Sequence, residues 1–266
     1  MTRFAKAHAC GNDFLIVEGP CDPELARKLC ERHTGIGADG VEFLEPAGAL
    51  AARIRLANAD GSIAEISGNG TRCVAAWMAH RQKAAAGAVV TLATDAGPRT
   101  CTIVSVAESR FQIAAGMGVP EVSQTQVALA DKTVVYGIRV SMGNPHFVIV
   151  VLDENFRAHG RGWQELGREI CFHPQFPQQI NVEFVRMIQA NAIEIRIFER
   201  GVGPTTSSGT GTCACAAAVI AHCGGRSPLT VHAPGGSQRV DWFGPGSEMI
   251  LTGPAELIAS GEVLLA

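Results

Sequence analysis

The sequence predicts an α+β protein built from two pseudo-symmetric, strand-rich domains, each wrapped around a central buried helix. A short motif occurs twice: residues 67–71 read Ser-Gly-Asn-Gly-Thr and residues 208–212 read Ser-Gly-Thr-Gly-Thr. An alanine-rich stretch, apolar on nearly every side, follows each copy, and a helix of that kind must be enclosed. Strand-like segments are the only abundant material around them, so two related halves are expected.

The expected elements follow from composition and periodicity. Runs rich in β-branched and aromatic residues, of which Ile-Glu-Ile-Arg-Ile at 193–197 alternates most clearly, predict strands. A surface helix is expected at 23–33, because Pro23 stands near its start and charges lie along one side. The two enclosed helices are expected at 73–79 and 213–221. Strands are expected at 14–18, 41–45, 52–57, 89–94, 111–115, 133–140, 147–152, 182–188, 192–199 and 229–232.

The length of 266 residues suits two domains, each large enough for its own core. The least patterned stretch, residues 116–132, lies near the midpoint and is where we place the link. We expect an N-terminal half at 1–118 and a C-terminal half at 119–266. A final strand at about 254–266 is expected to pack back on the first half.

Composition points to a small-molecule partner. Lys and Arg number 22 against 25 Asp and Glu, a net charge of -3 without a long basic run, so no nucleic-acid partner is expected. No apolar run approaches the ~18 residues of a membrane span, and the N-terminus has no apolar signal core, so we expect a cytoplasmic enzyme without membrane association. The nine scattered cysteines predict reduced thiols without a structural disulfide.

Several generic motifs do not hold in context. The Gly-x-Gly-x-x-Gly at 35–40 follows a helix and precedes a strand, the reverse of a dinucleotide site, and the glycines at 209 and 211 have no acidic residue about twenty positions on. No Gly-x-Ser-x-Gly occurs. Cys30 and His33 have no second ligand pair, and Cys213 and Cys215 are expected to be packing groups. We therefore expect neither a metal nor a cofactor.

The doubled motif itself favours an anion site. A helix start exposes backbone N–H groups with partial positive charge, and two facing starts would hold one small anion between them. Simple N-capping by serine is the alternative, but it leaves the paired glycines and the doubling unexplained.

Polar residues gather at the expected strand ends and turns. These are Gly-Asn-Asp-Phe at 11–14, Asn58, Gly-Asn-Pro-His at 143–146, Asn181, and Glu-Arg-Gly at 199–201, just before the second motif. In combination with the twin motif, they make the chain resemble diaminopimelate epimerases from residue 4 to residue 255, more closely than the related proline racemases.

The resemblance implies the diaminopimelate epimerase-like fold and a cofactor-independent epimerase that converts LL-diaminopimelate to the meso form in lysine and peptidoglycan precursor synthesis. It implies two catalytic residues, one per domain, acting as base and acid at Cα, and Arg200 as a fork for the distal carboxylate. Substrate-binding residues implied by the resemblance and the twin motif are Asn12, Asn58, Gly68, Asn69, Asn144, Asn181, Glu199, Arg200, Gly209 and Thr210.

The chain departs from the family at the catalytic positions, where Ser67 and Ser208 stand in place of two cysteines. A serine hydroxyl is a far weaker acid than a thiol and needs an adjacent base. His146 and Glu199, which the family uses to tune its thiols, are present and could serve as bases. A turn histidine held by backbone groups and a Glu199–Arg200 pair are the alternatives.

Three functions therefore stay open. The first is an epimerase or racemase, on diaminopimelate or another amino acid, that uses serines or has had its cysteines replaced by engineering. The second is an isomerase or lyase of the same superfamily with one surviving base. The third is a catalytically impaired amino-acid-binding homologue. The expected partner is a small amino acid, and a homodimer is left open.

Overall fold

The computed structural model describes residues 2–264 and divides into two compact units. Unit 1 comprises Met1–Gly116 and Thr252–Ala266, and unit 2 comprises Met117–Leu251. The chain thus enters unit 2 once and returns to unit 1 at its C-terminal end. That each unit is a domain able to fold by itself, with limits of 1–118 and 119–266, stays a prediction.

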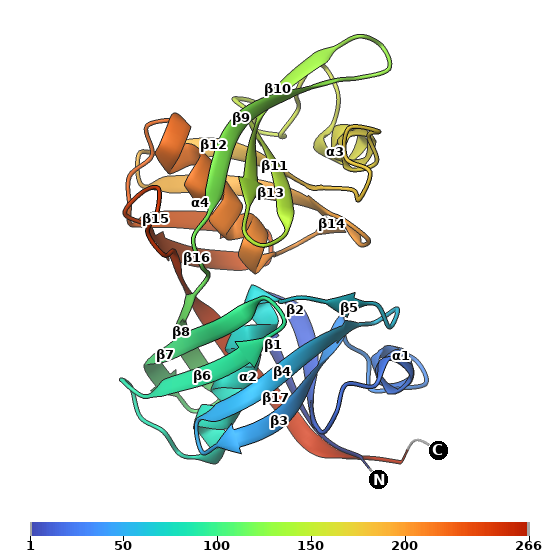
Figure 1. Cartoon of the computed structure of the whole chain (residues 1–266), viewed down its shortest axis with the longest axis vertical. Coiled ribbons are helices and arrows are strands. Elements are labelled where there is room, and N and C mark those ends of the chain that lie inside the picture. The colour runs from blue at the N-terminus through green and yellow to red at the C-terminus, as the bar shows by residue number, and fades with distance from the viewer. Residues whose placement is uncertain (1, 265–266) are drawn as a thin grey trace. The chain divides into compact units, whose positions relative to one another are not determined.

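Unit 1 is a closed barrel of strands around one helix (Figure 1). Each strand of the barrel pairs with the next, and the last pairs with both β8 and β1. Helix α2 (Gly68–Arg81) contacts strands on several sides of the barrel and lies inside it. The barrel strands are β1 (Thr2–Ala9), β2 (Asn12–Glu18), β3 (Gly40–Gly48), β4 (Ala51–Asn58), β6 (Val89–Thr94), β7 (Gly97–Ala107), β8 (Arg110–Gly116) and β17 (Ile250–Val263), with β5 (Ile63–Ala64) beside β4.

Unit 2 repeats the arrangement around α4 (Gly209–His222), whose first eleven residues are buried. Its strands are β9 (Glu121–Ala128), β10 (Val134–Ser141), β11 (Pro145–Val150), β12 (Asn181–Gln189), β13 (Ala192–Glu199), β14 (Gly203–Thr205), β15 (Leu229–Ala233) and β16 (Gly236–Asp241). The chain between β11 and β12 contains α3 (Trp163–Cys171), just as α1 (Pro23–Cys30) lies between β2 and β3.

Strand pairing shows the pseudo-symmetry directly. The β2–β3 and β11–β12 pairs are parallel, and each is followed by an antiparallel pair, β3–β4 and β12–β13. The second strand of each antiparallel pair then forms a parallel pair with a later strand: β4 pairs with β6, and β13 pairs with β15. The predicted fold class, two strand-rich halves each enclosing a helix, is confirmed.

Some element limits differ from expectation. Helices α2 and α4 begin at the second residue of each motif, because the serine before it caps the helix. Helix α1 ends at Cys30, so His33 lies outside it. The stretch at 116–132 contains β9, whose polar residues face outward. Helix α3 was not expected, because its four buried residues are spread through a polar segment.

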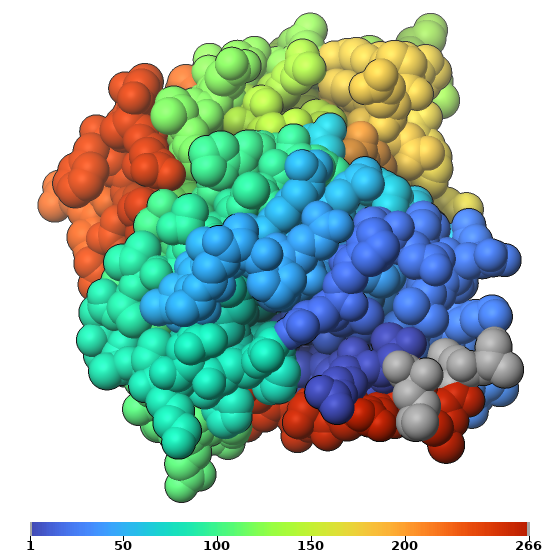
Figure 2. Space-filling view, turned by 60° about the horizontal axis from the view of Figure 1, so that its bottom comes forward, coloured from blue at the N-terminus to red at the C-terminus, as the bar shows by residue number. Residues whose placement is uncertain are grey.

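The C-terminal strand lies along the N-terminal one, with Thr2 opposite Val263 and Lys6 opposite Ala259. Figure 2 shows the red end of the chain beside its blue beginning. None of the nine cysteines, all among the described residues, forms a disulfide, and seven of them are buried. Among residues 2–264, no helix is long and apolar enough to cross a membrane.

Candidate active site

The two copies of the motif have the same local structure. Each serine is the N-cap of its helix: Ser67 Oγ accepts from Gly70 N at 3.0 Å, and Ser208 Oγ accepts from Gly211 N at 3.3 Å. The N–H groups of Gly68 and Gly209, in the first turn of each helix, have no acceptor inside it. Each helix start therefore offers partial positive charge to an anion.

A buried carboxyl group lies behind each helix start. Glu42 on β3 and Glu183 on β12 are at most 1% exposed. A Cβ atom on Gly70 would collide with Glu42 Oε1, and one on Gly211 would lie 3.0 Å from Glu183 Oε1. The second glycine of each motif is therefore explained by the space that this carboxyl group occupies.

The two carboxyl groups differ in their partners. Glu42 Oε1 has no hydrogen-bond partner, and burial raises the pKa of Glu42 to about 8. Glu183 Oε1 lies 2.7 Å from Nδ1 of His146, and the pKa of Glu183 is raised by burial but lowered by the charge and hydrogen bond of His146. The strand register shows which residue of unit 1 corresponds to His146. His146 pairs with Asn181 in unit 2, and Phe14 pairs with Gly40 at the same place in unit 1, so Phe14 is the equivalent residue.

In unit 1 a chain of hydrogen bonds orients two amides. The Arg72 guanidinium, fully buried, donates to Asn69 Oδ1 at 2.7 Å, and Asn69 Nδ2 donates to Asn12 Oδ1 at 3.1 Å. Asn12 Nδ2 in turn donates to Asp39 Oδ2 at 2.7 Å, and Arg32 holds the other oxygen of Asp39 at 2.9 Å. The oxygen and nitrogen of both amides are thereby fixed.

In unit 2 the corresponding amide is held by the histidine pair. Asn144 Nδ2 donates to Thr210 Oγ1 at 3.3 Å, matching the Asn12–Asn69 contact of unit 1. His146 Nε2 lies 3.0 Å from Asn144 Oδ1. Both ring nitrogens of His146 thus contact side chains, and the histidine lies in β11, so it is not a turn histidine held by backbone groups.

Glu199 ends β13 close to the second motif. Burial raises the pKa of Glu199, and hydrogen bonding from the Ser208 hydroxyl lowers it. The charge of Glu183 raises this pKa further, whereas His146 and the Thr205 hydroxyl lower it. A carboxylate beside a serine hydroxyl, with its pKa raised, is a stronger base than an ordinary glutamate.

Asn181 and Arg200 form a second polar group in unit 2. Asn181 Oδ1 accepts from the backbone N–H of Arg200 at 2.9 Å, and its Nδ2 donates to Pro145 O at 3.2 Å. The Arg200 guanidinium donates once, to Gln178 O at 3.3 Å, and is exposed. No Glu199–Arg200 ion pair forms in the described part of the chain.

The sequence-predicted residues are therefore divided between the units. Unit 1 contains Ser67, Gly68, Asn69, Asn12 and Asn58, and hydrogen bonds join Asn12 to Asn69. Asn58 Nδ2 instead donates to Ser62 Oγ at 3.0 Å. Unit 2 contains the remaining residues, of which Asn144, His146 and Thr210 are joined by hydrogen bonds.

Sequence reasoning missed Glu42, Glu183, Asp39 and Arg72. A signal for the two glutamates was present, since Val-Glu-Phe occurs at 41–43 and again at 182–184. A charged residue repeated inside an apolar strand predicts a buried polar group. The nearby thiols do not replace the serines: Cys73 and Cys213 are fully buried, and burial raises the pKa of Cys73.

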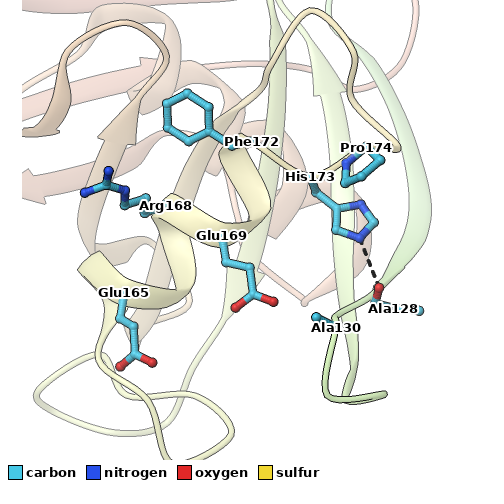
Figure 3. A pocket seen from close by; sticks show the side chains of 8 residues that line it. All are labelled: Ala128, Ala130, Glu165, Arg168, Glu169, Phe172, His173 and Pro174. Atoms are coloured by element: carbon cyan, nitrogen blue, oxygen red, sulfur yellow. Dashed lines mark hydrogen bonds between the residues drawn. The ribbon is translucent and has the colours of Figure 1, made fainter.

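A pocket of about 730 Å³ in unit 2 contains none of the candidate site residues. Figure 3 shows it between α3 and the end of β9, with His173 Nε2 lying 3.0 Å from Ala128 O. Its lining residues are Ala128, Ala130, Glu165, Arg168, Glu169, Phe172, His173 and Pro174. No group of three or more His, Cys, Asp and Glu among residues 2–264 is placed to hold a metal ion. The expectation of a metal-free site stays a prediction.

Comparison with known proteins agrees with a site in which each unit has a serine-capped helix start and polar partners. The family model described as "Diaminopimelate epimerase" matches residues 4–122 and 138–258. A diaminopimelate epimerase of Cyanothece sp. is 36% identical over 283 residues, which cover 97% of this chain and 98% of that protein. The chain belongs to the diaminopimelate epimerase family. A diaminopimelate epimerase of Halorhodospira halophila is also 36% identical, over 99% of this chain and 95% of its own length.

The fold is shared beyond the diaminopimelate epimerase family. The crystal structure of a probable proline racemase from Agrobacterium radiobacter superposes with a TM-score of 0.78 at 17% identity, covering 100% of this chain and 94% of that one. The family assignment makes the chain an isomerase by descent, and the strand pairing agrees with the fold of this group.

Proposed function

We propose that this protein is a cofactor-independent amino-acid epimerase that moves the α-proton of LL-diaminopimelate to give the meso form, in the cytoplasmic synthesis of lysine and peptidoglycan precursors. The observation that supports this proposal most directly is that each unit has a serine-capped helix start with oriented amides beside it. A site for an α-carboxylate requires such groups. Its family membership supports the substrate.

Each unit offers binding groups of its own. The N–H groups at a helix start, among them that of Gly68 in α2 and that of Gly209 in α4, are suited to hold an α-carboxylate as negative charge develops on it. Polar side chains bind the amino group and the carbon chain of the substrate. These are Asn12, Asn58, Asn69, Asn144, Asn181 and Thr210. The exposed donors of Arg200 form a fork for the distal carboxylate.

Proton transfer is centred on Glu199 and Ser208. The raised pKa of Glu199 brings this carboxylate closer to the basicity needed to accept an α-proton, directly or through the Ser208 hydroxyl. His146, buried between Asn144 and Glu183, acts as a positioning residue that fixes the amide and charges nearby. Ser67, the equivalent residue of unit 1, acts as the acid that returns a proton to Cα.

The test is deuterium incorporation at Cα. Incubating LL-diaminopimelate with the protein in D₂O should place deuterium at the reacting carbon, read by mass spectrometry, because exchange requires a working base. Glu199→Gln should abolish it. Tight binding without any exchange, in the protein and in the variant with both serines changed to cysteine, would make this chain an amino-acid-binding homologue instead.

A further inference from the structure

The two half-sites differ at one position that matters for proton transfer. Val41 on β3 pairs with Ala57 on β4, and the equivalent Val182 on β12 pairs with Phe198 on β13. The residue that follows is Asn58 in unit 1 and Glu199 in unit 2. The fold therefore places an amide, which cannot accept an α-proton, where the other half has a carboxylate.

Other acidic groups of unit 1 do not make up for this difference. Glu42 is buried behind Gly70, without access to solvent. Asp39 is engaged by Asn12 and Arg32. Glu65 is two residues before Ser67, but it is exposed and makes no hydrogen bond or ion pair among the described residues. Among the described residues, no hydrogen bond joins Ser67 to any of these three carboxyl groups, whereas the Ser208 hydroxyl is hydrogen-bonded to Glu199.

Unit 1 is instead built to stabilise an anion. Directly after its motif stands Arg72, a fully buried cation in α2 that donates to Gly68 O at 3.0 Å. The corresponding residue in unit 2, five positions after Ser208, is Cys213. Both helix starts have a buried carboxyl group behind them, but only unit 1 adds the cation Arg72, and only unit 2 adds the carboxyl group of Glu199. The two halves therefore suit different parts of the reaction.

Resting on the proposed function, we infer that unit 2 alone carries the proton-transferring group, so that the enzyme exchanges the α-proton on one face faster than it inverts the carbon. In this step the Cα–H bond breaks, its electron pair is delocalised onto the α-carboxylate, and the proton goes to Glu199. Solvent exchange on Glu199 followed by return of a deuteron to the same face gives labelled substrate of unchanged configuration.

Protonation from the other face is slow because Ser67 must act as the acid. A serine hydroxyl without a neighbouring base is a weak proton donor, and the proton it lost would have to be recovered from solvent. Inversion therefore becomes limiting. In a conventional two-base epimerase, by contrast, the second thiol protonates the opposite face as rapidly as the first one removes the proton.

The experiment compares exchange with inversion. LL- and meso-diaminopimelate are incubated separately with the protein in D₂O, and α-deuterium is measured in recovered substrate and in product. For one of the two substrates we expect deuterium to enter the unconverted substrate at least about tenfold faster than inversion occurs. Ser67→Cys should raise inversion relative to exchange, and Glu199→Gln should remove exchange.

Two results would overturn the inference. Equal rates of exchange and inversion for both substrates would show that each face has its own base. Loss of inversion in Glu65→Gln would identify that exposed carboxylate as the missing base of unit 1, whereas an unchanged exchange-to-inversion ratio supports the inference. Failure of the proposed function gives a different result: neither substrate exchanges, even in the variant with both serines changed to cysteine.

Discussion

Nδ1 of His146 lies 2.7 Å from Oε1 of Glu183, and both side chains are fully buried. The second ring nitrogen contacts Asn144 Oδ1 at 3.0 Å, so the pair also orients an amide of the candidate site. A buried carboxylate is tolerated only when an opposite charge or hydrogen bonds compensate it. Stability and site geometry therefore depend on the same contact.

Replacing His146 by the residue of unit 1 should expose that dependence. The variant His146→Phe leaves Glu183 without its partner, and removing one member of a buried pair costs about 3–5 kcal/mol. Urea unfolding at pH 7 measures the loss of stability. The double variant His146→Phe plus Glu183→Leu lacks the uncompensated charge and should regain much of the lost stability. A loss below about 1 kcal/mol in the single variant would contradict this account of the pair.

Glu42 should make the protein less stable at alkaline pH. Its pKa is raised by burial to about 8 from an ordinary value of 4.5, so the folded state holds a proton that the unfolded state has released. Between these values stability falls as pH rises, with a slope approaching ~1.4 kcal/mol per pH unit for this single group.

The measurement is the free energy of unfolding of the protein and of Glu42→Gln between pH 5 and pH 9. The variant should lack the contribution of Glu42 to the downward slope, so the stability difference between the two proteins should widen with pH up to about pH 8. Parallel curves would mean that Glu42 is already ionised in the fold and has an unseen partner.

The sequence predicted the fold where the local pattern had one physical explanation. Alternation at 193–197 matches β13, and the fully apolar stretches after the serines are enclosed helices. Among the strands it missed, β1 alternates buried with half-exposed residues, and its pairing with β17, the final strand expected at about 254–266, joins the two ends of the chain. Long-range pairing of this kind has no local signal.

The sequence named candidate residues of the site but not the network that holds them. Asn12, Asn144 and Glu199 were named because turn residues, the twin motif and the family resemblance marked them, and their roles stay predictions. Their partners were not, since Arg72 and Glu183 act from inside the units, where burial and strand register decide which side chains meet. The repeated Val-Glu-Phe was the one usable signal, and its meaning depends on the register of β3 and β12.

Arg200 should decide whether the substrate has a distal carboxylate. Lysine cannot reproduce the planar fork of arginine, so Arg200→Lys should weaken diaminopimelate binding by about 1.5 to 3 kcal/mol. Isothermal titration calorimetry measures this, with Arg168→Lys as the matched control, because Arg168 is exposed on α3 and lines the separate pocket. Unchanged affinity in Arg200→Lys would argue for a monocarboxylic amino acid.

The rate gained by restoring thiols tests the central claim, that this fold is an epimerase limited by its two serines. A helix start lowers the pKa of a thiol, whereas a serine hydroxyl at the same place stays several pKa units less acidic, each worth ~1.4 kcal/mol. The measurement is conversion of LL- to meso-diaminopimelate by the protein and by the variant carrying Ser67→Cys and Ser208→Cys. We predict weak or undetectable conversion by the protein and a large gain in the variant. Strong conversion by the protein, abolished by Ser67→Ala or Ser208→Ala, would contradict this account.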